Sequence, residues 1–184
     1  MTVWIGFLRA VNVGGVNRLP MAEFRDMLAG LAHGGQGLVG VKTYIQSGNA
    51  VFQSDLPQPV LGAMIADAVL AHFGFRPPIL LLTRAELEAA LAANPFPKAA
   101  PDKLHYFFMD RSLPNATAAF LKSLAGPTEE YAFRGKILWL HLPDGIGRSK
   151  LAHRVMNLPL DITARNGKSV AAIAILARKL AAAA

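Results

Sequence analysis

The chain has 184 residues, with 19 Lys and Arg against 12 Asp and Glu, so its formal net charge is +7, and 53% of its residues are hydrophobic. It contains no cysteine, which excludes disulfides, thiol nucleophiles, iron–sulfur clusters and thiolate zinc sites. No apolar run reaches the roughly 18 residues that a membrane-spanning helix needs. We therefore expect a cytoplasmic protein without a membrane partner, and the Ala-, Leu-, Gly- and Arg-rich composition favours a bacterial source.

The positive charge is concentrated toward the end of the sequence. Residues 1–133 carry ten Lys and Arg and ten Asp and Glu, whereas residues 134–184 carry nine Lys and Arg against Asp144 and Asp161. Such a concentrated positive field attracts anions such as phosphates, nucleotides or nucleic acid. The alternative is a solvated face that only keeps the protein soluble.

The first half of the chain predicts the element order β-α-β-β-α-β. Residues 2–8 have the β-branched and apolar character of a buried strand, and residues 20–32 have apolar side chains at helical spacing after Pro20. The glycine-rich segment 34–37 breaks this helix. The next elements are a hairpin of 41–46 and 49–53 with Gly48 at a positive φ, a helix ending at about Phe73 before Gly74, and an apolar strand, 78–83, expected at the centre of a sheet.

A helix at 84–94 and a proline-rich linker then lead to a second copy of the same pattern. The predicted elements are a strand at 104–109, a helix at 115–125 capped by Asn115, a hairpin of 130–133 and 136–142 through Arg134 and Gly135, a helix at 149–156, a strand at 160–164 and a final helix from about Gly167.

The predicted fold class is α+β, with two ferredoxin-like β-α-β-β-α-β units packed together and a C-terminal helix. The predicted domains are an N-terminal unit at 1–83, a helix and linker at 84–102, and a C-terminal unit with the terminal helix at 103–184. Ferredoxin-like units serve enzymes, RNA-binding proteins and ligand-binding modules, so the fold does not decide the function.

Familiar catalytic motifs are missing from the sequence. The five histidines show no metal-ligand spacing, so we predict no metal site and expect His105 and His141 to be satisfied structural residues. Ser47 lies outside a G-x-S-x-G elbow, and turn chemistry explains it equally well. Neither a Walker A loop nor a dinucleotide fingerprint is present. The sequence leaves enzymatic activity undecided and predicts no cofactor.

Cations flank three predicted helix starts. Arg18 precedes Pro20, Arg148 and Lys150 flank Ser149, and Arg165 and Lys168 flank Asn166. A cation at a helix start costs about 0.3–1 kcal/mol, and a bound anion would offset this repulsion. Gly145 and Gly147 would let backbone amides turn toward such an anion. The alternative is that the side chains extend into water, with Ser149 and Asn166 acting as ordinary N-caps.

Two other classes of function stay open at this stage. A nucleic-acid-binding protein would use the basic C-terminal face, but the only aromatic residue there that could stack on a base is Trp139, at an alternating strand position shared with core residues. An interaction module without chemistry would instead expose an apolar patch.

Four ordered motifs resemble a known family. They are RAVNVGG at 9–15 with NRLPMAEFR at 17–25, YIQSGNAVF at 44–52, GIGRSKL at 145–151, and TARN followed by SV at 163–170. Together they are similar to the domain of unknown function 1697 family. This resemblance implies a small bacterial α+β protein of ferredoxin-like units, and it brings no established activity, cofactor or substrate.

The resemblance and the charge pattern together give the candidate site. Its residues are Arg9, Asn12, Gly14, Gly15, Gln46, Ser47, Asn49, Arg148, Ser149, Lys150, Arg165, Asn166 and Lys168. Arg9 could instead pair with a carboxylate, and Asn12 and Asn49 could hold turns. Family members often have a Trp after the Arg–Asn of the last motif, where this chain has Gly167. That Trp either packs on a ligand or only packs at the helix start.

The leading hypothesis is a cytosolic protein that binds a phosphate-bearing, nucleotide-like small molecule. Arg148, Lys150, Arg165 and Lys168 would supply charge, and the loops at 12–15 and 46–49 would shape the pocket. If the protein is an enzyme, positioning and electrostatic stabilisation are the means open to it, because no nucleophile or acid–base pair is evident.

Overall fold

The computed structural model describes residues 1–183 and divides them into two compact units. Unit 1 consists of Met1–Glu88 with the C-terminal residues from Ala172 onward, and unit 2 consists of Ala89–Ala171. The division predicted from the sequence placed the whole terminal helix in the C-terminal unit, 103–184. In the structure, the part of this helix from Ala172 onward groups with unit 1. Arg178 Nε, near the end of that helix, donates to Glu88 Oε1 at 2.8 Å, and Leu180 contacts Gly40.

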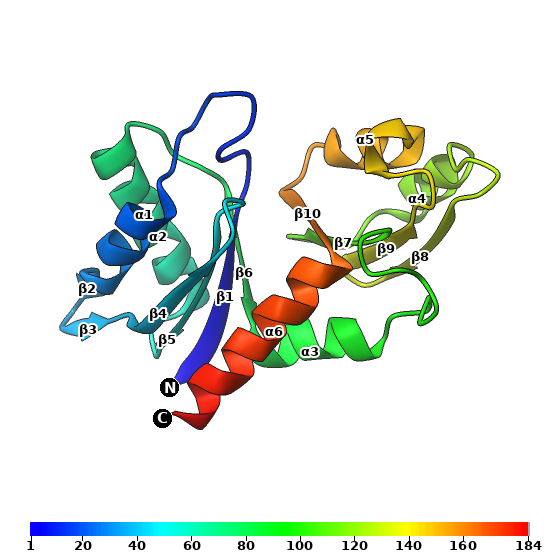
Figure 1. Cartoon of the computed structure of the whole chain (residues 1–184). Helices are drawn as coiled ribbons and strands as arrows, with labels where there is room; N and C mark the ends of the chain where they lie inside the picture. The colour runs from blue at the N-terminus through cyan, green and yellow to red at the C-terminus, as the bar shows by residue number, and fades with distance from the viewer. Residues whose placement is uncertain (184) are drawn as a thin grey trace. The chain divides into compact units, whose positions relative to one another are not determined.

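Unit 1 contains a four-stranded sheet and the helices that follow its strands (Figure 1). Its elements are β1 Thr2–Leu8, α1 Met21–Ala29, β2 Ala32–His33, β3 Gln36–Gly37, β4 Val39–Tyr44, β5 Asn49–Ser54, α2 Gln58–Phe73, β6 Ile79–Thr83 and the first part of α3 Arg84–Ala92. The strand order β4-β5-β1-β6, with antiparallel pairing throughout, is that of the ferredoxin-like split βαβ arrangement.

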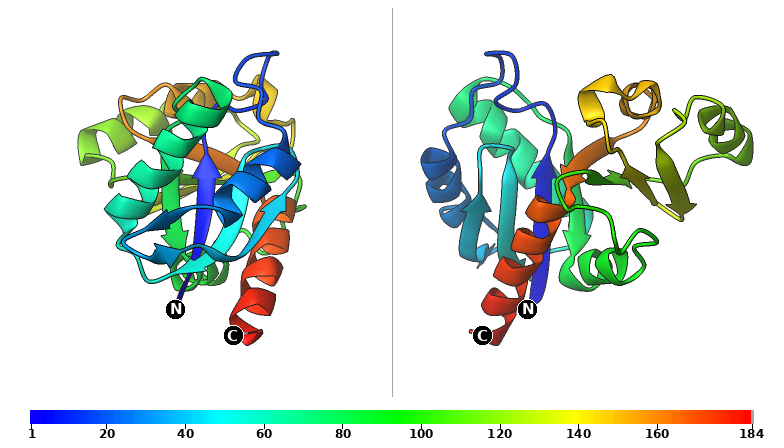
Figure 2. Two further views of the ribbon diagram at one scale, coloured as in Figure 1. Left: turned by 90° about the vertical axis from the view of Figure 1, so that its left-hand side faces the viewer. Right: turned by 45° about the vertical axis from the view of Figure 1, so that its right-hand side comes forward.

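Helices α1 and α2 lie on one face of this sheet, as the left view of Figure 2 shows. Fully buried side chains such as Phe24, Phe52 and Leu61 join the helices to the sheet in one hydrophobic cluster. The predicted turn glycines take positive φ values, 69° at Gly48 and 77° at Gly74, where the latter ends α2. Helix α1 ends three residues earlier than the sequence predicts, because the glycine-rich segment forms the small hairpin β2–β3.

One predicted position in the sheet is wrong. The apolar strand β6 lies at the edge of the sheet beside β1, not at its centre. An edge strand can be wholly apolar when its side chains are covered, and here Leu81 is buried while Ile79, Leu80 and Leu82 are half-buried. The exposed edge is further blunted because Gln58 Nε2 donates to the Leu81 carbonyl oxygen at 2.9 Å.

Unit 2 repeats the same topology with different residues. Its elements are β7 Leu104–Met109, α4 Asn115–Lys122, β8 Glu130–Arg134, β9 Ile137–His141, the 3₁₀ turn η1 Ile146–Arg148, α5 Lys150–Met156, β10 Ile162–Asn166 and the start of α6 Gly167–Ala182. The strand order β10-β7-β9-β8 is the same as that of unit 1 when the sheet is read from its opposite edge. Both ferredoxin-like units predicted from the sequence are therefore confirmed.

The core of unit 2 lies between its sheet and helices α4 and α5. Phe107, Leu138 and Leu151 are fully buried in this cluster. Asn115 does not cap α4 as predicted, because Pro114 is the N-cap residue and Asn115 is the first helical residue. Within residues 1–183, no helix is long and apolar enough to cross a membrane.

Candidate functional site

Asn12 organises the long loop that follows β1 in unit 1. Its side-chain amide donates to the carbonyl oxygens of Leu19 and Gln46, both at 2.9 Å, and its Oδ1 accepts from the Leu19 backbone N–H at 2.7 Å. These bonds tie the two ends of the loop to each other and to the β4–β5 turn. Asn12 therefore holds a turn, which was one of its two predicted roles.

The backbone of these two loops is strained. Ala10, Asn12, Asn17 and Ile45 all have positive φ, and they are the only non-glycine residues of the described chain that do. Asparagine tolerates this conformation, but Ala10 and Ile45 cost about 1–2 kcal/mol each in it. Asn17 offsets part of the cost, because its Nδ2 donates to the Ala10 carbonyl oxygen at 2.9 Å. Clustered strain of this kind persists only where surrounding contacts hold the backbone in place.

The glycine pair of the first motif forms the tip of this loop. Gly14 and Gly15 have φ of 60° and 78° with open space around them, and a bridge between Val13 and Val16 closes the turn. Both valines are more than 60% exposed. The glycines are therefore explained by turn geometry, and the tip carries apolar rather than anion-binding side chains.

The second motif is built into the β4–β5 turn. Asn49 is buried, and its Nδ2 donates to the Tyr44 carbonyl oxygen at 3.0 Å. Gln46 is exposed, and Ser47 is half-buried, as is Arg9 at the end of β1. Gly48 lies so close to the end of β1 and the following loop that an added Cβ would come within 2.9 Å of Leu8 Cβ and 2.6 Å of Val11 Cγ2. This second group of predicted residues thus belongs to the same small region of unit 1 as the first.

The candidate cations Arg148, Lys150 and Lys168 all lie in unit 2 and are exposed. They sit in η1, at the first residue of α5 and at the second residue of α6. None of the three forms an ion pair or a side-chain hydrogen bond with another part of the described chain, residues 1–183. Their charge is available to a bound anion.

The helix starts themselves are already capped. Ser149 is buried and its Oγ accepts from the Ala152 N–H at 3.0 Å, while Asn166 Oδ1 accepts from the Ser169 N–H at 2.9 Å. The Lys168 N–H donates to the Pro101 carbonyl oxygen at 3.3 Å. The interpretation of Ser149 and Asn166 as N-caps is therefore confirmed. An anion here would rely on side-chain charge rather than on free backbone amides.

Arg165 is partly buried on β10. Its guanidinium donates to Thr163 Oγ1 at 2.6 Å and to the Ala164 carbonyl oxygen at 2.9 Å. Burial lowers the pKa of Arg165 to about 10, so the side chain remains charged at neutral pH. The group is thus fixed along its own strand, and it adds positive potential to unit 2.

The topology of unit 2 brings the cationic segments to one end of its sheet. Leu104, at the start of β7, pairs with His141 at the end of β9, and His105 pairs with Asn166 at the end of β10. The Leu142 N–H donates to the Lys103 carbonyl oxygen at 2.8 Å, so the segment leading to η1 and α5 leaves from the same end. Residues far apart in sequence therefore meet at what we call the basic end of unit 2.

A pocket of about 410 Å³ lies at this end of the unit 2 sheet. It is lined by residues 95–99 together with Glu130 and His141, which face each other on β8 and β9. His141 Nδ1 lies 2.6 Å from Glu130 Oε2, so the expectation of a satisfied histidine holds for this nitrogen. Lys98 on the pocket wall is exposed and has no ion-pair partner within the described residues.

His105 differs from its prediction. The residue is only 7% exposed, and its Nδ1 has no hydrogen-bond partner among the described residues, so it is not satisfied as expected. Burial lowers the pKa of His105 and favours the neutral ring. Sequence spacing cannot reveal this, because the environment of a strand residue depends on which elements cover its face.

Trp139 is 2% exposed and packs edge-on against Tyr106. A buried ring offers no platform on which a base can stack. Within residues 1–183, no group of three or more His, Asp or Glu side chains is placed to hold a metal ion.

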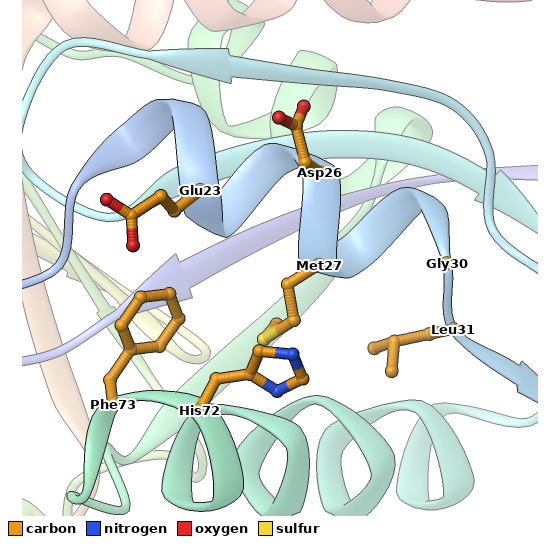
Figure 3. Close-up of a pocket in the computed structure, with 7 residues that line it drawn as sticks. All are labelled: Glu23, Asp26, Met27, Gly30, Leu31, His72 and Phe73. Atoms are coloured by element: carbon orange, nitrogen blue, oxygen red, sulfur yellow. The ribbon is translucent and has the colours of Figure 1, made fainter.

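A second pocket lies between α1 and α2 of unit 1 (Figure 3), and neither this pocket nor the one in unit 2 was predicted from the sequence. It measures about 540 Å³ and is lined by Glu23, Asp26, Met27, Gly30, Leu31, His72 and Phe73. Glu23 and Phe73 lie toward each other across the gap, whereas the Asp26 carboxylate points away from α2. The amphipathic patterns of both helices were recognisable, but the space between them depends on how they pack.

Gly167 follows the Arg165–Asn166 pair of the last motif, at the position where the family resemblance implies a Trp. It is buried, and an added Cβ would lie 2.8 Å from the Pro101 carbonyl oxygen and 3.3 Å from the Pro101 Cα. A larger residue would therefore have to displace the backbone before β7. The backbone packs so closely at the start of α6 that only glycine fits at position 167 without a shift of the neighbouring backbone.

The fold and site define an α+β protein of two ferredoxin-like units, of which the second carries a pocket and unpaired cations at one end of its sheet. The sequence matches a model described as "Protein of unknown function (DUF1697)" over residues 1–139, and the chain belongs to this family. The last two motifs of the predicted resemblance lie beyond the matched residues.

A solved structure supports the same assignment. The chain is similar to the conserved bacterial protein SP0830 from Streptococcus pneumoniae, with 28% sequence identity and a TM-score of 0.74. The match covers 96% of this chain and 98% of the other. No curated protein gives a significant match.

Proposed function

We propose that this protein is a cytosolic bacterial protein that binds a phosphate-bearing, nucleotide-like small molecule at the basic end of unit 2. The observation that carries the proposal is a group of exposed cations without ion-pair partners in segments that reach the pocket end of the unit 2 sheet, with Lys98 in the pocket lining. Lys98, Arg148, Lys150 and Lys168 are exposed and lack ion-pair partners among residues 1–183, and topology brings their segments to the end of the sheet that holds the 410 Å³ pocket.

The charge of the two units supports the choice of unit 2. Unit 2 carries eleven Lys and Arg against six Asp and Glu, whereas unit 1 carries eight against six. Clefts bordered by one sign of charge raise the local concentration of oppositely charged ligands. Lysine and arginine are the side chains that hold phosphate groups by charge-assisted hydrogen bonds.

The loops of unit 1 have a different part in this proposal. Asn12 and Asn49 already use their amides within the loops, so we assign them to loop architecture rather than to direct ligand contact. The proposed charged contacts are limited to the unit 2 cations.

A thermal-shift screen of the full chain over inorganic phosphate, sugar phosphates, nucleotides and single-stranded DNA tests the proposal. A ligand at a hundred times its dissociation constant should stabilise the protein by roughly 2.7 kcal/mol. The double variant Lys98→Ala/Arg148→Ala should lose most of the shift. The matched control is Arg134→Ala/Lys136→Ala, which removes the same two charges at the β8–β9 turn, the opposite end of the sheet.

Three outcomes would count against the proposal. The absence of a shift with every phosphate compound would overturn it. An equal loss in both double variants would show that net charge, not the basic end, attracts the ligand. A shift with DNA alone, falling steeply with salt, would favour the nucleic-acid alternative.

A second candidate function, an interaction module, is favoured by one observation in unit 1. Val13, Val16 and Ile45 are 63%, 64% and 49% exposed, and the bond from Asn12 to Gln46 joins their two loops. Exposed apolar side chains on a rigid loop are typical of contact surfaces. In size-exclusion chromatography, elution of the wild-type chain ahead of the monomer position, with a return to monomer size in Val13→Ser/Val16→Ser, would support self-association through this tip.

A further inference from the structure

The pocket of unit 2 has preformed walls. Residues 95–99 form one side, and Pro95 and Pro97 restrict their backbone. Asn94 Oδ1 accepts from the Phe96 N–H at 2.9 Å, and the Ala99 N–H donates to the Phe96 carbonyl oxygen at 3.1 Å. The other side consists of side chains from β8 and β9, which are paired strands of the sheet. Such a pocket does not need to order itself when a ligand binds.

Two side chains of this pocket, Glu130 and His141, form a hydrogen-bonded pair. Glu130 and His141 are directly opposite each other on β8 and β9, and Glu130 Oε2 lies 2.6 Å from His141 Nδ1. Because a carboxylate only accepts hydrogen bonds, it fixes the proton of the neutral imidazole on Nδ1. The Phe96 ring lies against the imidazole, with centroids 6.3 Å apart, and restrains its orientation.

The remaining imidazole nitrogen is left without a partner. His141 Nε2 forms no hydrogen bond with any other group of residues 1–183, and the His141 ring lines the pocket. In this tautomer Nε2 carries a lone pair and can accept a hydrogen bond. The pocket therefore contains a positioned hydrogen-bond acceptor that the fold does not use.

Lys98 contributes the opposite kind of group to the same pocket. Its ammonium carries a full charge on an exposed, flexible side chain, and no acidic partner in the described residues neutralises it. An ammonium attracts an anionic group, while Nε2 of His141 accepts from a hydroxyl. A ligand that satisfies both carries a negative charge and at least one hydroxyl group.

We infer that this pocket binds a small hydroxylated anion, with its charged group at Lys98 and one hydroxyl donating to His141 Nε2. Glu130 is a positioning residue that acts through His141. The inference rests on the proposed function for the identity of the charged group, a phosphate. It adds that the rest of the ligand is sugar-like and that His141 selects for its hydroxyl.

Calorimetric titration of the full chain with three probes tests this. The probes are inorganic phosphate, ribose 5-phosphate, and gluconate, which carries hydroxyl groups and a carboxylate but no phosphate. Wild type should bind ribose 5-phosphate more tightly than inorganic phosphate. The variant His141→Phe keeps a ring against Phe96 but has no Nε2, so it should lose about 3- to 10-fold in affinity for ribose 5-phosphate. Its affinity for inorganic phosphate should stay within about twofold.

Two further variants separate the acceptor from general effects. His153→Phe removes an exposed histidine of α5 outside the pocket lining and should change neither affinity. Glu130→Gln keeps a hydrogen-bond acceptor for Nδ1 but removes the charge of the carboxylate that orients the ring, so its loss should be smaller than that of His141→Phe and also confined to the hydroxylated probes. Amide NMR spectra show whether each variant is folded.

The outcomes distinguish this inference from the proposed function. If ribose 5-phosphate binds no more tightly than phosphate, or if His141→Phe weakens both equally, the inference fails and phosphate binding stands. If only gluconate binds, in a His141-dependent way, the phosphate proposal fails and the hydroxyl site stands. If no probe binds, both fail. The nitrogen-15 shifts of His141 give a test without ligand, because a proton on Nε2 instead of Nδ1 would overturn the inference.

Discussion

The two units of this protein share one strand order but use their polar residues differently. In unit 1 the loop after the first strand spans residues 9–20 and is held by three hydrogen bonds of Asn12. In unit 2 the equivalent connection, residues 110–114, is short, and Asp110 simply exchanges hydrogen bonds with Asp161. Unit 1 thus uses the side-chain amide of Asn12 to hold a strained loop, whereas the connection in unit 2 is short and has no positive φ at a non-glycine residue.

The charged residues differ in the same way. In unit 1 Arg25, Arg76, Arg84 and Arg178 each form an ion pair with a carboxylate. In unit 2, Arg111 forms an ion pair with Asp110, whereas Lys98, Arg148, Lys150 and Lys168 are exposed and form none within residues 1–183. The comparison teaches that two copies of one topology can be specialised separately, one for loop shape and the other for charge. Substitutions in the two units test this difference.

The largest effect is expected from Gly48→Ala in unit 1. The new Cβ would lie 2.6 Å from Val11 Cγ2 and 2.9 Å from Leu8 Cβ, at a φ of 69° that disfavours alanine. We expect the free energy of unfolding to fall by about 2–4 kcal/mol, measured by urea denaturation. Gly14→Ala, at φ of 60° with open space, is the control and should cost about 1–2 kcal/mol.

Unit 2 offers a counterpart to this test. Gly167→Ala puts a Cβ 2.8 Å from the Pro101 carbonyl oxygen and should cost about 1–3 kcal/mol. If Gly48→Ala proves no more harmful than Gly14→Ala, the close approach of the β4–β5 turn to β1 is not a constraint on the fold.

The second prediction compares Asn12 with Asn166. Asn12→Ala removes three hydrogen bonds and should destabilise the protein by about 1–3 kcal/mol. Asn166→Ala removes one N-cap bond and should cost about 1 kcal/mol. Equilibrium unfolding measures both. Asn12→Gly retains the positive φ without the side-chain bonds, and stability equal to wild type in that variant would contradict the structural role of the amide.

The third prediction concerns pH and is specific to unit 2. Burial lowers the pKa of His105, whereas His33 and His72 of unit 1 are exposed. As pH falls below about 6.5, the unfolded state takes up a proton before folded His105 does, so the protein loses stability, at most about 1.4 kcal/mol per pH unit. His105→Leu should flatten this slope between pH 7 and 5, and it also removes the unpartnered Nδ1. Thermal unfolding across this range checks it, and an unchanged slope would exclude His105 as the source.

Much of the fold follows from local sequence patterns. The alternation between apolar strands and helical spacing predicted both β-α-β-β-α-β units, because each pattern reflects how one element buries one face. Gly48 and Gly74 were recognisable as turn and helix-end residues since a positive φ favours glycine. The edge position of β6 and the true cap of α4 were not predictable, because partners in a sheet and backbone angles at a helix start are set by neighbours in space.

The sequence by itself determined the elements, their order, the excess of positive charge and the motifs of the family. These are properties of short segments and of composition, which need no long-range contacts. The tertiary structure decided which cations stay unpaired, that Ser149 and Asn166 serve as caps, and that Glu130 and His141 meet across a strand pair beside Lys98. The physical reason is that hydrogen bonds and pockets join residues distant in sequence, so they exist only once the strands have paired.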